Sequence, residues 1–140
     1  MSSAKKPASL IIGVVLMILL GLARGIGGII LLIQGKTTLS NIKTDESVLI
    51  FLSIGLIIIG IFEIISAVGI YYLKRKYWFL GIAVTVLFVI DGAINGYFLF
   101  GKPDDQGTLV NLFIAIIIIT FLLIGGKSLN DKNKISQNHN

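Results

Sequence analysis

The chain has 140 residues, of which 55% are hydrophobic and only 14% are charged. This composition is too apolar for a soluble domain of the same length and is typical of proteins embedded in a bilayer. The net charge of +5 comes from Lys and Arg in segments beside the apolar stretches, which favours a membrane surface over nucleic acid as their partner. There is no Cys, and the only His is His139. Disulfides, thiolate metal sites and Ser/His/Asp or Cys/His catalysis within one chain are therefore excluded.

Four apolar stretches organise the chain. Each is long enough, at about 1.5 Å per residue, to cross a hydrocarbon core about 30 Å thick as an α-helix. The stretches lack the alternating polarity of membrane strands, and a lone span in lipid has to satisfy its own backbone hydrogen bonds. The sequence therefore predicts an all-α, integral membrane four-helix bundle over residues 10–126, with helices at residues 10–33, 48–73, 77–100 and 108–124.

Polar segments lie at both ends of the chain and between the stretches. Residues 1–9 are predicted to be a cytoplasmic segment, and residues 127–140, rich in Asn and Lys, a disordered cytoplasmic tail.

Only residues 74–76 separate the second and third stretches, which predicts a tight hairpin between belt aromatics. Asp45 and Glu46 suit a helix N-terminus, whose N–H groups and dipole favour anions. The other breaks hold Gly35, Lys36, Pro103, Gly125 and Gly126, and the belt aromatics are Tyr71, Tyr72, Tyr77 and Trp78.

The distribution of Lys and Arg orients the predicted bundle. Four spans put both termini on one side of the membrane, together with the 74–76 hairpin. Cytoplasmic segments of membrane proteins carry an excess of basic residues, and eight of these residues fall on that side against three on the other. Both termini are therefore predicted to be cytoplasmic. The eight are Lys5, Lys6, Lys74, Arg75, Lys76, Lys127, Lys132 and Lys134, and the three are Lys36, Lys43 and Lys102.

The first stretch has an alternative interpretation. Lys5 and Lys6, followed by an apolar run and small residues just before Arg24, match the pattern of a signal peptide cleaved at that point. However, the apolar run resumes after Arg24 and reaches Ile33. This continuation favours a full membrane span over a cleaved leader.

Three ionisable residues, Arg24, Glu63 and Asp91, lie near the middle of three different stretches. Counting about 1.5 Å per residue from the outer ends puts Arg24 about 15 Å deep and Asp91 about 14 Å deep, so the two can meet. Glu63 lies near the midplane as well. A charge at the centre of a membrane helix costs about 2.5 to 3.5 kcal/mol on insertion scales, so it normally faces a partner, a cavity or a pathway. Asn95, one turn from Asp91, completes the predicted intramembrane polar cluster.

Small residues accompany each of these charges on its own helix face. Small side chains let two helix backbones approach closely, so these faces are predicted to form the bundle interior. Gly60 and Ala67 flank Glu63 at spacings of three and four. The predicted helix-packing glycines are Gly21, Gly25 and Gly28 beside Arg24, and Gly92 and Gly96 beside Asp91.

Three interpretations of the charged residues are open. In the first, Arg24 and Asp91 form a buried ion pair that fixes helix register, while Glu63 is protonated or hydrogen bonded and merely tolerated. In the second, one Arg and two carboxyl groups leave an excess acid in a low dielectric, which can carry a proton or bind a cation. In the third, the polar face binds a lipid head group or a partner helix. Glu63 is the residue on which these interpretations differ most.

Glycines and an aromatic turn recur between residues 49 and 101, namely Gly55, Gly60, Glu63, Ala67, Gly69, the 74–76 turn, Tyr77, Trp78 and Gly81. This run resembles small four-pass membrane proteins of prokaryotes that are grouped as domains of unknown function, DoxX-like in the loose sense. The resemblance implies a four-helix fold and a prokaryotic plasma membrane. It brings no catalytic residues.

The function predicted from these patterns is non-enzymatic. We expect a multi-pass protein of the plasma (inner) membrane that acts through helix packing, as a subunit, assembly factor or immunity-type protein. Its expected partners are the lipid bilayer and a second copy or another membrane protein, without nucleic acid, cofactor or metal. The alternative is a small oligomeric transporter or proton/cation pathway that uses Glu63 with an Arg24/Asp91 pair. A lipid-modifying enzyme would have to use Glu63 and Asp91, and no nucleophile with its base or metal-ligand cluster supports one.

Overall fold

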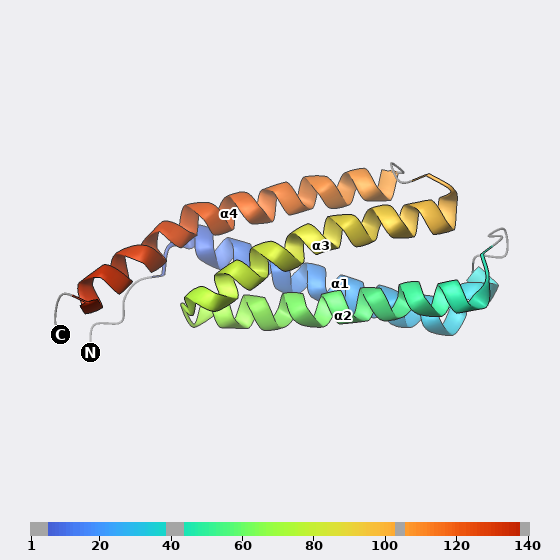
Figure 1. Cartoon of the computed structure of the whole chain (residues 1–140), viewed down its shortest axis with the longest axis horizontal. Coiled ribbons are helices and arrows are strands. Elements are labelled where there is room, and N and C mark those ends of the chain that lie inside the picture. Colours follow the sequence, from blue (N-terminus) through green and yellow to red (C-terminus); the bar gives the residue numbers. More distant parts are fainter. Residues whose placement is uncertain (1–5, 39–43, 103–105, 138–140) are drawn as a thin grey trace.

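A computed structural model describes residues 6–38, 44–102 and 106–137. Within these residues the chain forms four α-helices and no strand. The helices run back and forth, so that both termini lie at one end of the molecule (Figure 1). This confirms the predicted all-α, four-helix architecture. The helices are α1 (Ala8–Thr38), α2 (Glu46–Tyr71), α3 (Arg75–Phe100) and α4 (Gln106–Gln137).

Each helix contains a segment that is long and apolar enough to cross a membrane, namely Ala8–Gln34, Glu46–Tyr71, Arg75–Phe100 and Gln106–Gly126. Large apolar side chains cover the outside of the bundle, and Ile33 and Phe51 are 73% and 70% exposed. A soluble monomer rarely exposes continuous apolar surface on this scale, whereas lipid solvates it at no cost. The chain is therefore a multi-pass membrane protein.

The hairpin between α2 and α3 lies two residues earlier than predicted. Residues 72–74 form the turn, and Arg75 and Lys76 already belong to α3. The N–H of Lys74 donates to the carbonyl of Gly69 (3.1 Å), and that of Leu73 donates to the carbonyl of Ile70 (2.8 Å). This pair of bonds is a Schellman motif with Leu73 in the left-handed conformation, at φ 59°. The sequence did not predict it, because a branched apolar residue rarely takes that conformation.

The last helix is longer than predicted. We expected it to end at residue 124 and to give way to a disordered tail, but α4 continues through Gln137. The sequence predicts a stop at Gly125 and Gly126. A glycine inside a helix costs only about 1 kcal/mol relative to alanine, and no proline follows these two. The helical hydrogen bonds of the backbone therefore continue past them. Residues 138–140 lie outside the described residues.

The other helix ends agree more closely with the sequence. α1 runs past the predicted residue 33 to Thr38. Asp45 is the N-cap residue of α2, but its carboxylate makes no capping hydrogen bond. Gly101 closes α3 in the left-handed conformation at φ 72°. Pro103, in the next predicted break, lies outside the described residues.

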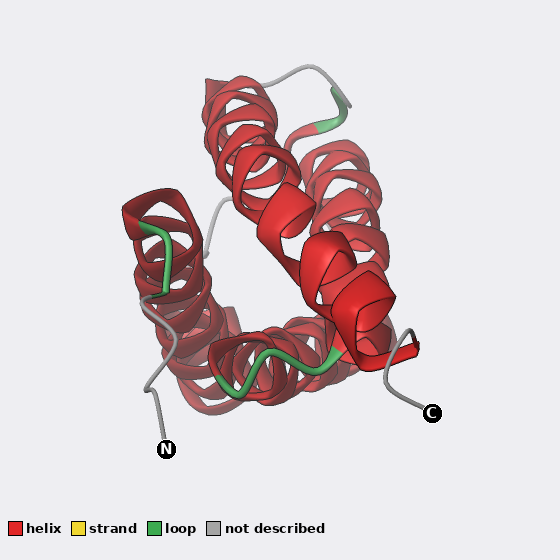
Figure 2. Ribbon diagram, turned by 90° about the vertical axis from the view of Figure 1, so that its left-hand side faces the viewer, coloured by secondary structure: helices red, strands yellow, loops and turns green. Residues whose placement is uncertain are grey.

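The four helices form a ring in which each described helix packs against two neighbours, α1 and α3 each against α2 and α4. Figure 2 shows this arrangement from the end that holds both termini. We call the half of the bundle nearest the termini the terminal half, and the other the distal half. The hydrophobic core of the terminal half consists of Leu10, Val14, Met17, Ala67, Ile70, Ile118 and Leu122.

Glycines and one tryptophan close the terminal half. A Cβ on Gly13 would lie 3.2 Å from the Leu122 side chain, and one on Gly125 would lie 2.9 Å from Leu10, so α1 and α4 are in close contact there. The Trp78 indole donates from Nε1 to the carbonyl of Leu122 (2.8 Å), which joins α3 to α4. The helices are thus held together at one end, and their arrangement at the other end positions the polar residues.

Candidate functional site

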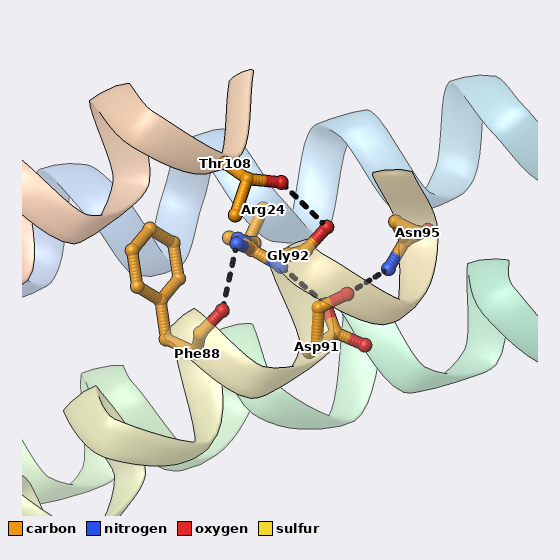
Figure 3. Close-up of polar contacts among 6 residues, drawn as sticks. All are labelled: Arg24, Phe88, Asp91, Gly92, Asn95 and Thr108. Carbon is orange, nitrogen blue, oxygen red and sulfur yellow. Dashed lines mark hydrogen bonds and ion pairs between the residues drawn. The ribbon is translucent and has the colours of Figure 1, made fainter. Parts of the chain in front are cut away.

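Arg24 crosses the middle of the bundle. Its residue is only 8% exposed, and its guanidinium donates to the carboxylate of Asp91 and to the backbone carbonyl of Phe88, the latter at 3.2 Å (Figure 3). The Phe88 ring lies under the guanidinium, 3.9 Å from its carbon atom. Among the described residues α1 and α3 are not packing neighbours. Arg24 therefore connects two helices that face each other across the ring.

Close packing of α1 on α2 sets the starting point of that side chain. A Cβ on Gly21 would lie 2.7 Å from the carbonyl oxygen of Gly60, and one on Gly28 would lie 2.8 Å from that of Ser53. Only glycine allows both approaches. Arg24 lies between these two glycines in the sequence. Its Cβ lies 3.4 Å from the position that a Cβ on Gly60 would take, so it is in close contact with α2. The long side chain then extends toward α3.

Asp91 is positioned by two neighbours besides Arg24. Its Oδ1 lies 3.3 Å from the position of a Cβ on Gly55, so that glycine leaves room for the carboxylate beside α2. Asn95 donates from Nδ2 to the backbone carbonyl of Asp91 (2.8 Å), while its own Oδ1 is buried and has no hydrogen-bond partner. The structure thus brings Arg24, Asp91 and Asn95 together, as their depth and spacing predict.

Glu63 lies apart from these hydrogen bonds. It is fully buried, and neither carboxyl oxygen has a hydrogen-bond partner. Its Cβ lies 3.2 Å from the position a Cβ on Gly21 would take, so the side chain leaves α2 against α1. The buried hydroxyls behave differently, because Ser53, Ser66 and Thr85 each donate to a carbonyl four residues earlier in their own helix, at 2.7, 2.7 and 2.8 Å. Glu63 is the buried acid that the fold leaves unsatisfied.

A cavity of about 250 Å³ opens in the distal half beside Arg24. Its polar lining comes from Arg24, Asn95, Thr108 and Asn111, and its apolar lining includes Leu56 and Phe100. Thr108 donates to the carbonyl of Gly92 (3.1 Å), which fixes the start of α4 against α3 (Figure 3). Because polar side chains inside lipid need a water-filled space or partners, this cavity provides such a space for the polar residues that line it.

The predicted packing glycines divide into three groups. Gly21 and Gly28 lie in the close contact of α1 with α2. Gly92 and Gly96 line the cavity, and a Cβ on Gly92 would lie 2.7 Å from Nδ2 of Asn111, so this glycine makes room for a side chain rather than for a helix backbone. A Cβ on Gly25 would meet nothing within 4 Å.

Sequence reasoning missed Thr108 and Asn111 of α4. Asn111 is the only Asn, Asp, Glu, Lys or Arg between residues 106 and 126. An amide in the middle of an otherwise apolar span has a cost in lipid, so this position carried a usable signal. Asn111 carries no formal charge, so it does not stand out among the ionisable residues of the spans.

Among the residues that the structure describes, no group of three or more His, Cys, Asp and Glu is arranged to hold a metal ion. Comparison with family models, with curated proteins and with solved structures finds no match for this chain. The resemblance to small four-pass proteins therefore stays a prediction. What the site offers chemically is one buried guanidinium, two buried carboxyl groups and an open polar cavity on one side of them.

Proposed function

We infer that this chain is a small transport-type membrane protein in which Glu63 takes up and releases a proton. The observation that carries this proposal is the fully buried carboxyl group of Glu63, whose two oxygens have no hydrogen-bond partner. An unsatisfied buried polar group costs about 1 to 3 kcal/mol. A packing protein gains nothing from such a group, whereas a proton carrier needs a carboxyl group that is not locked by a permanent partner.

The charges around Glu63 favour its neutral form at rest. An ionised carboxylate in an apolar site without a partner is costly, so the proton stays bound. Within the apolar spans, the charged group that acts on Glu63 is Arg24 from α1. Asp91 from α3 is bound to Arg24, and α4 has no charged residue between positions 106 and 126. Since Arg24 is already engaged by Asp91, it does not hold Glu63 in the ionised form.

A single guanidinium near two acids couples their protonation. When Glu63 releases its proton to one side of the membrane, the new carboxylate attracts Arg24, and Asp91 loses part of its counter-charge. Asp91 then takes up a proton from the opposite side, which leaves one positive and one negative charge in the cluster. Passing this proton on to Glu63 restores the resting state and completes the transfer. Arg24 lines the cavity, and it is therefore placed between the cavity and the buried acid.

The test is proton flux into proteoliposomes driven by a pH gradient. Glu63→Gln keeps the shape of the side chain but cannot release a proton, and we expect it to abolish the flux. Glu46→Gln makes the same change at the first residue of the same helix and should leave the flux intact. Equal flux in the wild type and in Glu63→Gln eliminates this role for Glu63.

Helix packing is the second candidate function, and one observation favours it. A Cβ on Gly25 would meet open space, so the side of α1 that carries Gly25 has room for a helix of a partner or of a second copy. Gly25→Leu should then abolish a complex detected by native mass spectrometry. A complex that survives the substitution speaks against this role.

The location and orientation of the protein belong to the same proposal. Eight Lys and Arg residues flank the spans on the side of the termini against three on the other side, which supports cytoplasmic termini. A plasma membrane location fits both candidate functions. Accessibility of a Cys introduced at Ser2 or at Thr37 to a membrane-impermeant thiol reagent in whole cells tests the orientation, since the parent chain has no Cys.

A further inference from the structure

We propose that the distal cavity binds a small monocarboxylate, whose oxygens accept hydrogen bonds from Arg24 and Asn111. The proposal rests on the proposed function, because it names a solute whose binding is coupled to the uptake of a proton. The ligand is defined by its chemistry: one carboxylate group, and an apolar part of a few carbon atoms.

Two hydrogen-bond donors converge above Gly92. A Cβ at this position would lie 2.7 Å from Nδ2 of Asn111 and 3.6 Å from a terminal nitrogen of Arg24. Gly92 therefore leaves room for the Asn111 amide, and the two donors lie near each other on the lining of the cavity. A guanidinium has five N–H donors, and two bonds from Arg24 to described acceptors use two of them. Donors remain for an acceptor that enters the cavity.

The geometry of this space matches a carboxylate. Planar guanidinium and carboxylate groups form paired hydrogen bonds at fixed spacing. The amide of Asn111 supplies a further donor from α4, and the bond from Thr108 to Gly92 holds that helix in place. The cavity walls also include Leu56 and Phe100, which offer an apolar surface to a short alkyl chain.

The size of the cavity limits the ligand. A volume of 250 Å³ corresponds to about eight water molecules at roughly 30 Å³ each. A two- to five-carbon acid fits this space together with some water. A long-chain fatty acid exceeds this volume and would have to extend through the open side of the cavity, so a water-soluble acid is the expected ligand.

Charge balance couples this ligand to a proton. Arg24 can offset one negative charge, and in the described structure that charge belongs to Asp91. A second anion beside Arg24 in a low dielectric leaves an uncompensated charge, which is costly. Binding of one carboxylate is therefore accompanied by uptake of one proton, which Asp91 accepts because Glu63 already holds its own. Over the pH range where the solute itself stays ionised, its affinity should rise as the pH falls.

Propionate binding to the purified full-length chain in nanodiscs, measured by calorimetry between pH 6 and pH 8, tests the proposal. With one proton taken up per anion, Kd should fall about tenfold for each unit by which the pH is lowered. Asn111→Leu removes one donor, and Gly92→Ala places a methyl group where the donors converge. Each should weaken binding at least tenfold, while Leu112→Ala on the exposed side of α4 and Gly25→Ala in open space should not. Absence of saturable binding, or equal binding in all four variants, overturns the proposal.

Two further arms separate the possible sources of failure. Decanoate that displaces propionate at equal concentration overturns the assignment to a small soluble acid. Proton flux measured without propionate tests Glu63 separately. If Glu63→Gln abolishes this flux but propionate does not bind, the carboxylate site fails and the proposed function stands. If propionate binds in the cavity but Glu63→Gln leaves proton flux unchanged, the binding site stands and the proposed function fails.

Discussion

The two halves of the bundle differ in what fills the space between the helices. In the terminal half, apolar side chains such as Met17, Ile118 and Leu122 are completely buried and join α1 to α4. In the distal half, the corresponding space is a cavity lined by Arg24, Asn111 and other polar groups. The closed half holds the helices together, and the open half keeps its polar groups around the cavity.

Glycine has one role in the terminal half and two in the distal half. In the terminal half, a Cβ on Gly69 would lie 2.0 Å from Cγ of Tyr77, so the absence of a side chain permits dense packing of α3 on α2. In the distal half, Gly28 likewise permits close contact of α1 with α2, whereas the absence of a side chain on Gly92 leaves space for hydrogen-bond donors. Beside the cavity, glycine therefore makes room for polar groups.

The largest expected effect on stability comes from breaking the ion pair between Arg24 and Asp91. Asp91→Leu leaves the Arg24 guanidinium buried without its counter-charge. Removing one partner of a buried ion pair costs about 3 to 5 kcal/mol, and we expect a loss of that size in the free energy of unfolding, measured by steric trapping in bicelles. The double variant Arg24→Leu with Asp91→Leu should lose much less, because no charge is left unpaired. Equal losses in the single and double variants would contradict a specific pair.

A second test compares the two kinds of glycine directly. Gly69→Ala forces the Tyr77 ring to shift, because the new methyl group would overlap Cβ and Cγ, at 2.5 and 2.0 Å. Overpacking of this kind costs about 1 to 3 kcal/mol. Gly25→Ala in the open region meets no atom and gains helix propensity, so its stability should be unchanged or slightly higher. The same unfolding assay measures both, and a loss in Gly25→Ala as large as in Gly69→Ala would remove the distinction between the halves.

Much of the fold was predictable because lipid leaves the backbone few choices. A span in hydrocarbon has to satisfy its own hydrogen bonds, so four long apolar stretches specify four helices. The pairing of Arg24 with Asp91 was also within reach, since their depths match and an isolated charge is costly. The interior position of Gly21 and Gly28 followed from their spacing around Arg24.

The remaining features depend on three-dimensional packing. The left-handed turn at Leu73 arises because its side chain packs on the core of the terminal half. The residues next to Leu73 in the sequence do not predict that contact. α4 continues to Gln137 because the helix-propensity cost of two glycines is too small to end a helix. The open space at Gly25 could not be foreseen either, because spacing alone does not tell which side of a helix lacks a neighbour.

A third prediction sharpens the contrast by making the middle of the bundle apolar. Glu63→Met has nearly the same length and removes two buried oxygens that have no partner. We expect the free energy of unfolding to rise by about 1 to 2 kcal/mol, since the cost of an unsatisfied polar group disappears. Ser66→Ala, one turn away, removes a hydroxyl that is hydrogen bonded to Phe62 and should bring no such gain. A less stable Glu63→Met protein would show that the acid contributes to folding.

A smaller effect is expected at the turn at the distal end of α3. Gly101 has φ 72°, a conformation that costs a residue with a Cβ about 1 kcal/mol or slightly more. Gly101→Ala should therefore lower the free energy of unfolding by about 1 kcal/mol. Gly101→Asn should cost less, because the short amide side chain tolerates this conformation. Equal losses for the two substitutions would show that the cost comes from crowding and not from the backbone.

The turn at the terminal end of α3 should respond differently, although its backbone conformation is similar. Leu73 has φ 59° and packs against the core of the terminal half. Leu73→Gly relieves about 1 kcal/mol of backbone cost but gives up the packing of a half-buried side chain, which is of similar size. The two terms oppose each other, so the free energy of unfolding should change by less than in Gly101→Ala. If Leu73→Gly stabilised the protein by about 1 kcal/mol, the Leu73 side chain would contribute no packing energy at the terminal end. The two halves would then differ only in the distal cavity.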